Sequence, residues 1–211
     1  MIITKERIAK WDNVKFILIL LVVVGHVVGA YTENSPSAKS LFLFIYLFHM
    51  PAFIFLAGLF GKRTVQEKRY DKILGYFVLF LGMKILIFTV RKLIGQRPLF
   101  ELFSEGGVSW FIFAIAIFYL VTIVLKRYSP KYIFPVIISL ACFVGYDKSI
   151  GDFLVLSRII VYYPFFYLGY CLSADDVLNL VRRREMKIMA LIILCTVALV
   201  CIANIDAVYW L

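Results

Sequence analysis

Apolar stretches long enough to cross a lipid bilayer dominate this chain of 211 residues. A helix needs about 20 residues to span the hydrocarbon layer. The composition agrees, since 63% of the residues are hydrophobic and 17% are charged, against about 45–50% and about 25% in soluble domains. These values exclude a soluble enzyme, a secreted module and a disordered chain. We therefore predict an all-α, polytopic membrane helix bundle.

Seven transmembrane helices are expected from the pattern of apolar runs. We predict one domain over residues 1–211. Because the last apolar run reaches the end of the chain, a domain that lacks its C-terminal helices is a second interpretation. The predicted spans are Val14–Tyr31, Ser40–Phe60, Ile73–Ile94, Trp110–Leu125, Tyr132–Tyr146, Phe153–Cys171 and Ile188–Leu211.

The basic residues indicate how the chain is oriented. The net charge is +10, but the cations lie in short loops between apolar runs. With the N-terminus inside, the inner segments carry fifteen lysines and arginines and the outer segments carry five. This bias is typical of a membrane protein with a cytoplasmic N-terminus. It favours membrane lipid, and not nucleic acid, as the partner of the cations.

Ionisable side chains inside the predicted spans are candidates for function, because such groups cost several kcal/mol in hydrocarbon. There are five of them: Lys15, His26, His49, Lys84 and Arg158. The four cysteines show no CxxC pair and no Cys/His spacing, so we expect no metal site.

Lys15 and His26 lie on the same predicted helix. Their separation of 11 residues corresponds to about 16 Å and to nearly three full turns, so the two side chains face the same way. Asp12 lies within reach of Lys15 if the helix begins early. One interpretation is a polar stripe with His26 as a proton carrier. The other is a lysine that snorkels to the interface and a histidine with a structural partner.

His49 and Arg158 belong to other spans. His49 lies in the outer half of the second span. Two interpretations are open: it is a structural partner, or it shares a pocket with His26. Arg158 keeps its charge and must contact water, an acid or an anionic ligand, or snorkel outward. The inner loop Gly61–Lys72 has five basic residues in twelve positions. Such a loop suits a phosphate-rich ligand or anionic lipid.

Several short motifs together resemble a known family. The pieces are Lys15 and His26 with ten residues between them, F-H-M-P-A-F-I-F-L-A-G at 48–58, Arg69-Tyr70-Asp71-Lys72, Ser109-Trp110-Phe111-Ile112, and Arg158 with Y-P-F-F-Y-L-G-Y at 163–170. In this order they resemble the acyltransferase family 3 membrane O-acyltransferases, most closely the branch similar to fucose 4-O-acetylases. Two positions depart from that pattern: Ala57 replaces a serine and Lys72 replaces an arginine.

The resemblance implies transfer of an acyl group, commonly acetyl, from cytoplasmic acyl-CoA to a carbohydrate hydroxyl at the outer face. Acetyl-CoA would be a donor substrate and not a bound cofactor. The implied setting is the bacterial inner membrane. The implied roles are catalytic for His26 and Arg158, donor-binding for Lys15, Arg69 and Lys72, and acceptor-binding for His49 and Trp110.

The helix geometry agrees with this chemistry. The pantetheine arm of acyl-CoA would have to extend about 15 Å from the inner cations to His26, which is close to the distance between Lys15 and His26 along the helix. Neutral imidazole can take the proton of the attacking hydroxyl. Direct transfer and a covalent acyl-histidine are both open. Family members have more helices than this chain, so a non-catalytic truncated member is an alternative, as is a small-solute transporter. The acceptor sugar and a homo-oligomeric state are also open.

Overall fold

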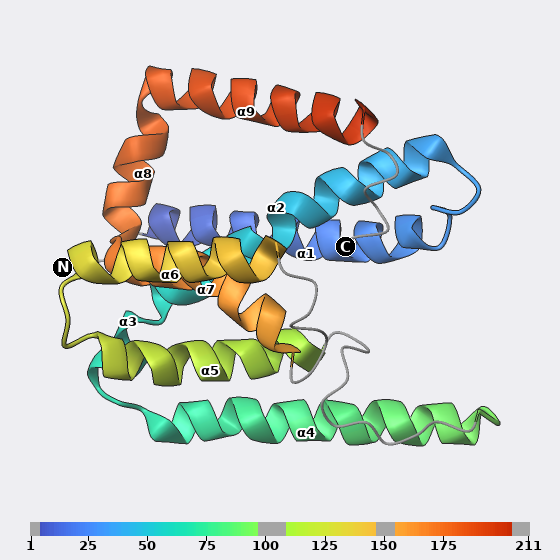
Figure 1. The fold of residues 1–211 in the computed structure, drawn as a ribbon, viewed down its shortest axis with the longest axis horizontal. Helices are drawn as coiled ribbons and strands as arrows, with labels where there is room; N and C mark the ends of the chain where they lie inside the picture. The colour runs from blue at the N-terminus through green and yellow to red at the C-terminus, as the bar shows by residue number, and fades with distance from the viewer. Residues whose placement is uncertain (1–4, 97–108, 147–154, 204–211) are drawn as a thin grey trace. The chain divides into compact units, whose positions relative to one another are not determined.

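The computed structural model describes residues 5–96, 109–146 and 155–203. Within these ranges every regular element is an α-helix (Figure 1). In chain order they are α1 (Lys5–Gly29), α2 (Pro36–Phe60), α3 (Lys62–Gln66), α4 (Tyr70–Leu93), α5 (Ser109–Leu125), α6 (Pro130–Tyr146), α7 (Leu156–Cys171), α8 (Ala174–Arg182) and α9 (Arg184–Ala203).

The helices confirm the predicted membrane bundle. Each predicted span matches one long helix, although the start of the sixth at residue 153 and the end of the seventh at residue 211 lie outside the described residues. Four helices are long and apolar enough to cross a bilayer, namely α1 from Ala9 onward, α2, α4 and α9, while α5 and α6 are shorter apolar helices. The count of seven crossings therefore stays a prediction, as does the cytoplasmic N-terminus.

Two short helices, α3 and α8, were not predicted. Both lie in polar connections between apolar runs, where a search for membrane spans assigns loops. The α8 sequence ADDVLNLVR repeats apolar residues at helical spacing on one face, with acids at its start and arginine at its end. These charges suit the helix dipole, so α8 has local reasons to be helical without an apolar run.

The chain forms two compact units, Met1–Phe53 with Ala174–Leu211, and Ile54–Ser173. The prediction of a single domain stays a prediction. In the first unit α1 packs on the first half of α2 through two glycines. A Cβ on Gly25 would lie 3.1 Å from the Tyr46 ring, and one on Gly29 would lie 3.1 Å from the Phe42 ring. Small residues four positions apart are typical of close helix contacts in membranes.

The second unit has an aromatic core in which α4 packs against α5 and α6 packs against α7. Phe118 and Phe166 are fully buried, and their ring centroids are 5.4 Å apart. The Tyr163 hydroxyl is satisfied inside this core by Thr122 Oγ1 at 3.0 Å. Buried hydroxyls need such partners, because an unpaired one costs about 1–3 kcal/mol.

Helices α2 and α7 touch through a reciprocal pair of glycines. A Cβ on Gly58 would collide with the carbonyl oxygen of Phe166, and a Cβ on Gly169 would collide with the carbonyl oxygen of Phe55. The collisions involve backbone atoms, which cannot rotate away as a side chain would. Only hydrogen fits at both positions, and this explains why glycine occupies residues 58 and 169 of the two motifs.

We expect Gly58→Ala and Gly169→Ala each to destabilise the fold by about 1–3 kcal/mol or more, the cost of inserting a carbon into a packed site. The measurement is the midpoint of thermal unfolding in detergent, followed by tryptophan fluorescence. Gly82→Ala on α4 is the matched control, since a Cβ there meets nothing within 4 Å. Equal midpoints for the three variants would contradict the reported crossing.

Candidate functional site

Lys15 is positioned by an ion pair on α1. Because the helix begins at Lys5, Asp12 and Lys15 fall on one turn, and Lys15 Nζ lies 3.4 Å from Asp12 Oδ1. This confirms the predicted reach between the two side chains. Lys15 is half-buried and His26 is exposed on the same uninterrupted helix. Their proposed functional roles stay predictions.

His49 is buried on α2, with 3% of its surface exposed. Its Nδ1 lies 2.7 Å from the carbonyl oxygen of Ile45. A carbonyl oxygen can only accept, so Nδ1 carries the proton and Nε2 of the neutral ring is left as an acceptor. The edge of the Tyr46 ring contacts the imidazole, with centroids 4.8 Å apart.

Tyr46 on α2 contacts residues beside both histidines. Its ring packs on Gly25, which precedes His26 in the chain, and its edge contacts His49. The pocket shared by His26 and His49 stays a prediction. Tyr46 was not predicted as a site residue, although its place three residues before His49 puts both on one side of α2.

In the second unit, Arg158 and Trp110 meet. The guanidinium carbon of Arg158 lies 5.3 Å from the centroid of the Trp110 ring, a distance typical of a cation–π contact. Tyr162 stacks on the same ring at 5.8 Å. We call Trp110, Arg158 and Tyr162 the aromatic–arginine cluster. Tyr162 was missed from the sequence, although it follows Arg158 by one helical turn.

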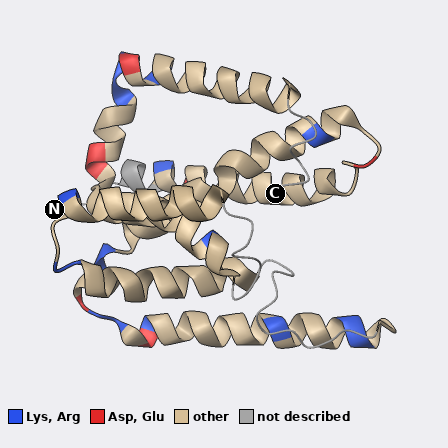
Figure 2. Ribbon diagram, viewed as in Figure 1, with Lys and Arg blue, Asp and Glu red and all other residues tan. Residues whose placement is uncertain are grey.

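Basic residues lie beside the C-terminal end of α5, at the other end of the helix from Trp110. Residues 61–72, which we call the cationic turn, comprise α3 and the start of α4, and Figure 2 shows Lys and Arg at both ends of α4. Arg63 pairs with Glu67 at 2.8 Å, and Arg69 pairs with Asp71 at 3.0 Å. The hydrogen bond to Asp71 raises the pKa of Arg69 above its ordinary value.

The backbone of the cationic turn is held in a strained form at Lys68, whose φ is 50°. The Arg69 N–H donates to Thr64 O at 3.0 Å, and the Lys68 N–H donates to Val65 O at 3.4 Å. These two bonds form a Schellman motif, in which glycine is the usual left-handed residue. A lysine at this position costs about 1 kcal/mol.

The predicted donor residue Lys72 also contacts an aromatic residue. Its ammonium lies over the Tyr119 ring, 6.0 Å from the centroid. The Tyr119 hydroxyl donates to the carbonyl oxygen of Ala57 at 3.4 Å, at the position where the family resemblance expected a serine. Tyr119 was not predicted, because its contacts come from residues far away in the chain. Lys84 is buried separately, 5.9 Å from the centroid of the Phe80 ring.

The predicted site residues thus fall into groups. Lys15, His26 and His49 belong to the first unit, and the other four belong to the second. Within the second unit, Trp110 and the end of α5 beside the cationic turn are about 24 Å apart along the helix. The aromatic–arginine cluster and the cationic turn are therefore separate sites.

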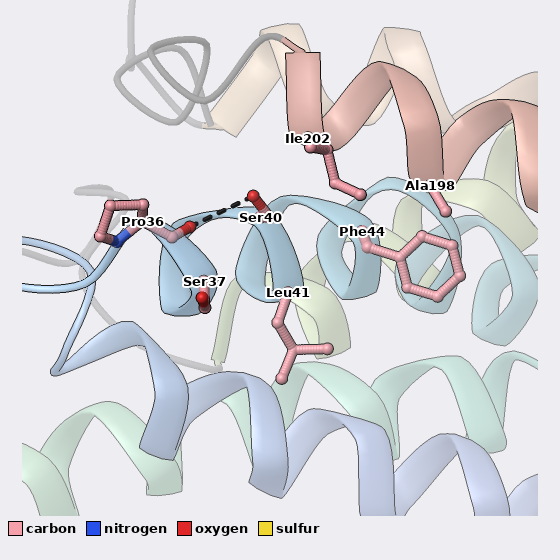
Figure 3. Close-up of a pocket in the computed structure, with 7 residues that line it drawn as sticks. All are labelled: Pro36, Ser37, Ser40, Leu41, Phe44, Ala198 and Ile202. Atoms are coloured by element: carbon pink, nitrogen blue, oxygen red, sulfur yellow. Dashed lines mark hydrogen bonds between the residues drawn. The ribbon is translucent and has the colours of Figure 1, made fainter.

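A groove in the first unit lies between the first half of α2 and α9 (Figure 3). Its lining is mainly apolar, and the Ser40 hydroxyl is already bonded to the carbonyl oxygen of Pro36 at 3.2 Å. None of the predicted site residues lines it. In the described ranges, no group of three or more His, Cys, Asp or Glu side chains is arranged to hold a metal ion.

Comparison with known proteins identifies the family. The family model described as "Acyltransferase domain" matches residues 8–211. The chain is 26% identical over 209 residues to the nodulation protein NolL of Sinorhizobium fredii, covering 87% of this chain and 54% of that protein. It is 28% identical over 186 residues to NolL of Mesorhizobium japonicum, covering 79% of this chain and 48% of that protein.

The chain thus spans about half the length of these curated relatives. No solved structure matches it. Since the family model covers nearly the whole sequence, the chain belongs to the acyltransferase 3 family.

Proposed function

We propose that this protein is a membrane O-acyltransferase that moves an acyl group, acetyl in the simplest case, from acyl-CoA to a carbohydrate hydroxyl. Family membership supports acyl transfer. The observation that carries the finer proposal is the separation of two sites at opposite ends of α5. One is rich in cations and suits an anionic donor, and the other pairs aromatic rings with a guanidinium and suits a polyhydroxy acceptor.

The donor's phosphates are assigned to the cationic turn. It carries five cations and two acids, and each acid is already paired with an arginine. Lys68 and Lys72 are exposed at the turn. Arg69, although paired with Asp71, retains further N–H donors for a phosphate. Lys15, in the first unit, is a further candidate for the donor.

His26 is assigned the proton transfer. The acceptor oxygen attacks the thioester carbonyl carbon while the imidazole of His26 takes the hydroxyl proton. The carbon–sulfur bond then breaks, and the leaving CoA thiolate takes the proton from the His26 imidazolium, which returns the imidazole to its neutral form. His49 suits a role in holding the acceptor, because its Nε2 is the ring nitrogen left to accept a hydrogen bond from a hydroxyl.

Arg158 and Trp110 are assigned to the acceptor side. The indole offers a flat apolar face and the guanidinium offers fixed donors in a plane. A guanidinium so placed can orient a sugar hydroxyl or stabilise the negative charge that develops on the thioester oxygen. The Trp110 ring contacts both Arg158 and Tyr162, and these contacts restrict where the Arg158 head can lie.

A non-catalytic member of the family is the second candidate. It is favoured by one observation, namely that Ala57 stands where the family resemblance expects a serine hydroxyl. A non-catalytic member would bind acetyl-CoA without consuming it. The same transfer assay separates the two candidates, because binding without turnover supports only the second.

The first test concerns His26. In proteoliposomes with radiolabelled acetyl-CoA and a panel of nitrophenyl glycosides, we expect His26→Ala to reduce label transfer about 100-fold or more, the usual contribution of a general base. Val27→Ala, at the exposed neighbour, should leave the rate within about twofold. Full transfer by His26→Ala would remove this residue from the mechanism.

The second test concerns the donor cations. We expect Arg69→Gln with Lys72→Gln to weaken acetyl-CoA binding about tenfold or more, since charge-assisted hydrogen bonds are worth about 1.5–3 kcal/mol each. Equilibrium dialysis of the purified protein measures the Kd. Arg91→Gln with Lys92→Gln removes two cations from the other end of the same helix and should change the Kd little. An equal loss in both double variants would indicate a general charge effect and contradict the assignment.

The third test separates function from stability at Lys68. Lys68→Gly should relieve backbone strain and raise the unfolding free energy by about 1 kcal/mol, while weakening acetyl-CoA binding through the lost cation. Lys62→Gly, at the first residue of α3, relieves no left-handed backbone and should not raise the unfolding free energy. Thermal midpoints and the Kd are measured on the same preparations. Lower stability of Lys68→Gly would contradict the left-handed turn.

A further inference from the structure

Lys126 connects the end of α5 to the cationic turn. Its Nζ donates to the carbonyl oxygen of Val65 at 2.9 Å and to that of Gln66 at 3.3 Å. The two acceptors lie at the end of α3, 61 and 60 residues earlier in the chain. Carbonyl groups at a helix end lack partners within the helix, and the ammonium supplies a donor to two of them.

The bonds from Lys126 fall at the point where the turn is strained. Val65 O accepts from Lys126 and also from the N–H of Lys68, the residue with positive φ. The carbonyl of Val65 is thereby fixed from two sides. Because the Lys68 N–H must point to this oxygen, the ammonium of Lys126 helps to hold Lys68 and Arg69 in their positions.

The other side of the turn is fixed by packing. Val65 is completely buried and Thr64 is 3% exposed. Gly61 lies so close to Tyr119 that a Cβ there would be 2.6 Å from the ring. The turn is therefore tied to α5 at two places, by Tyr119 within the helix and by Lys126 just after its last residue.

Lys126 is half-buried, and two of its three N–H donors are used by the turn. Arg127, the next residue, carries the same charge and is exposed. Lys126 therefore binds the turn, and Arg127 serves as the matched control for the loss of one positive charge.

We propose that Lys126 is a positioning residue of the donor site, which fixes the cationic turn so that Lys68 and Arg69 meet the phosphates of acyl-CoA. This inference rests on the proposed donor site at the turn. Lys126 acts through the backbone of Val65 and Gln66, and it adds positive potential without being a phosphate ligand itself.

The experiment compares Lys126→Met, Lys126→Arg and Arg127→Met with the unaltered protein in nanodiscs. Acetyl-CoA Kd, KM and kcat are measured separately. For Lys126→Met we expect Kd and KM to rise about tenfold, consistent with the loss of one charge-assisted interaction, and kcat to stay within about twofold. Lys126→Arg restores most of the affinity, and Arg127→Met changes it less than about twofold. A purely structural defect would lower kcat and the folded fraction instead.

The outcomes are distinct. If the unaltered protein binds acetyl-CoA and Lys126→Met matches Arg127→Met, the positioning role is wrong while the donor site stands. If the unaltered protein does not bind acetyl-CoA, the proposed donor site fails and the role of Lys126 fails with it. If Lys126→Met does not fold, Lys126→Gln is used in its place, because the amide keeps N–H donors and removes the charge. Unchanged acetyl-CoA affinity in Lys126→Gln would show that no cation is needed at this position and would overturn the proposal.

Discussion

The close contact of α2 at Gly58 with α7 at Gly169 is the constraint on which the second unit depends. At this crossing the backbones of α2 and α7 touch, and neither position has room for a methyl group. Beyond Gly58, α2 leads directly into the cationic turn, while α7 carries Arg158 on the turns before Gly169. Close backbone contact gives the strongest dispersion between apolar helices in lipid, where no hydrophobic effect drives association. Fixing these two helices fixes the framework of both candidate sites.

The second unit then separates two kinds of chemistry along α5. At one end, Lys126 and the cationic turn concentrate positive charge beside buried backbone carbonyls. At the other end, the Arg158 guanidinium lies over the Trp110 ring, on which Tyr162 also stacks. A charged donor and a polyhydroxy acceptor need such different surfaces. This separation is the physical reason for assigning the two substrates to different ends of the unit.

Hydropathy was sufficient to predict where the long helices lie. The second span was predicted to end at Phe60 and the fourth at Leu125, and α2 and α5 end at these residues. Local contacts were also predictable, because Asp12 and Lys15 are one turn apart and form the expected pair. The short α3 was missed, since its stability comes from tertiary contacts of Val65 and Gly61 that hydropathy does not record.

Long-range contacts could not be predicted from one sequence. Arg158 and Trp110 were each singled out, but their cation–π contact joins residues from α5 and α7. Tyr119 and Lys126 were not assigned to a site, because their partners are about 60 residues away. A resemblance between motifs identifies candidate site residues, but it does not identify the residues that hold them in place. The supporting residues are recognisable only when the helices are packed.

Hydrogen–deuterium exchange of residues 61–72, with and without acetyl-CoA, tests the central assignment most directly. Amide exchange reports on opening of the backbone, and a phosphate seated on the turn should slow it. The expected result is acetyl-CoA-dependent protection of this segment that is lost at high salt, where ionic contacts are screened. Unchanged exchange in the segment at saturating acetyl-CoA would contradict the assignment of the donor site to the cationic turn.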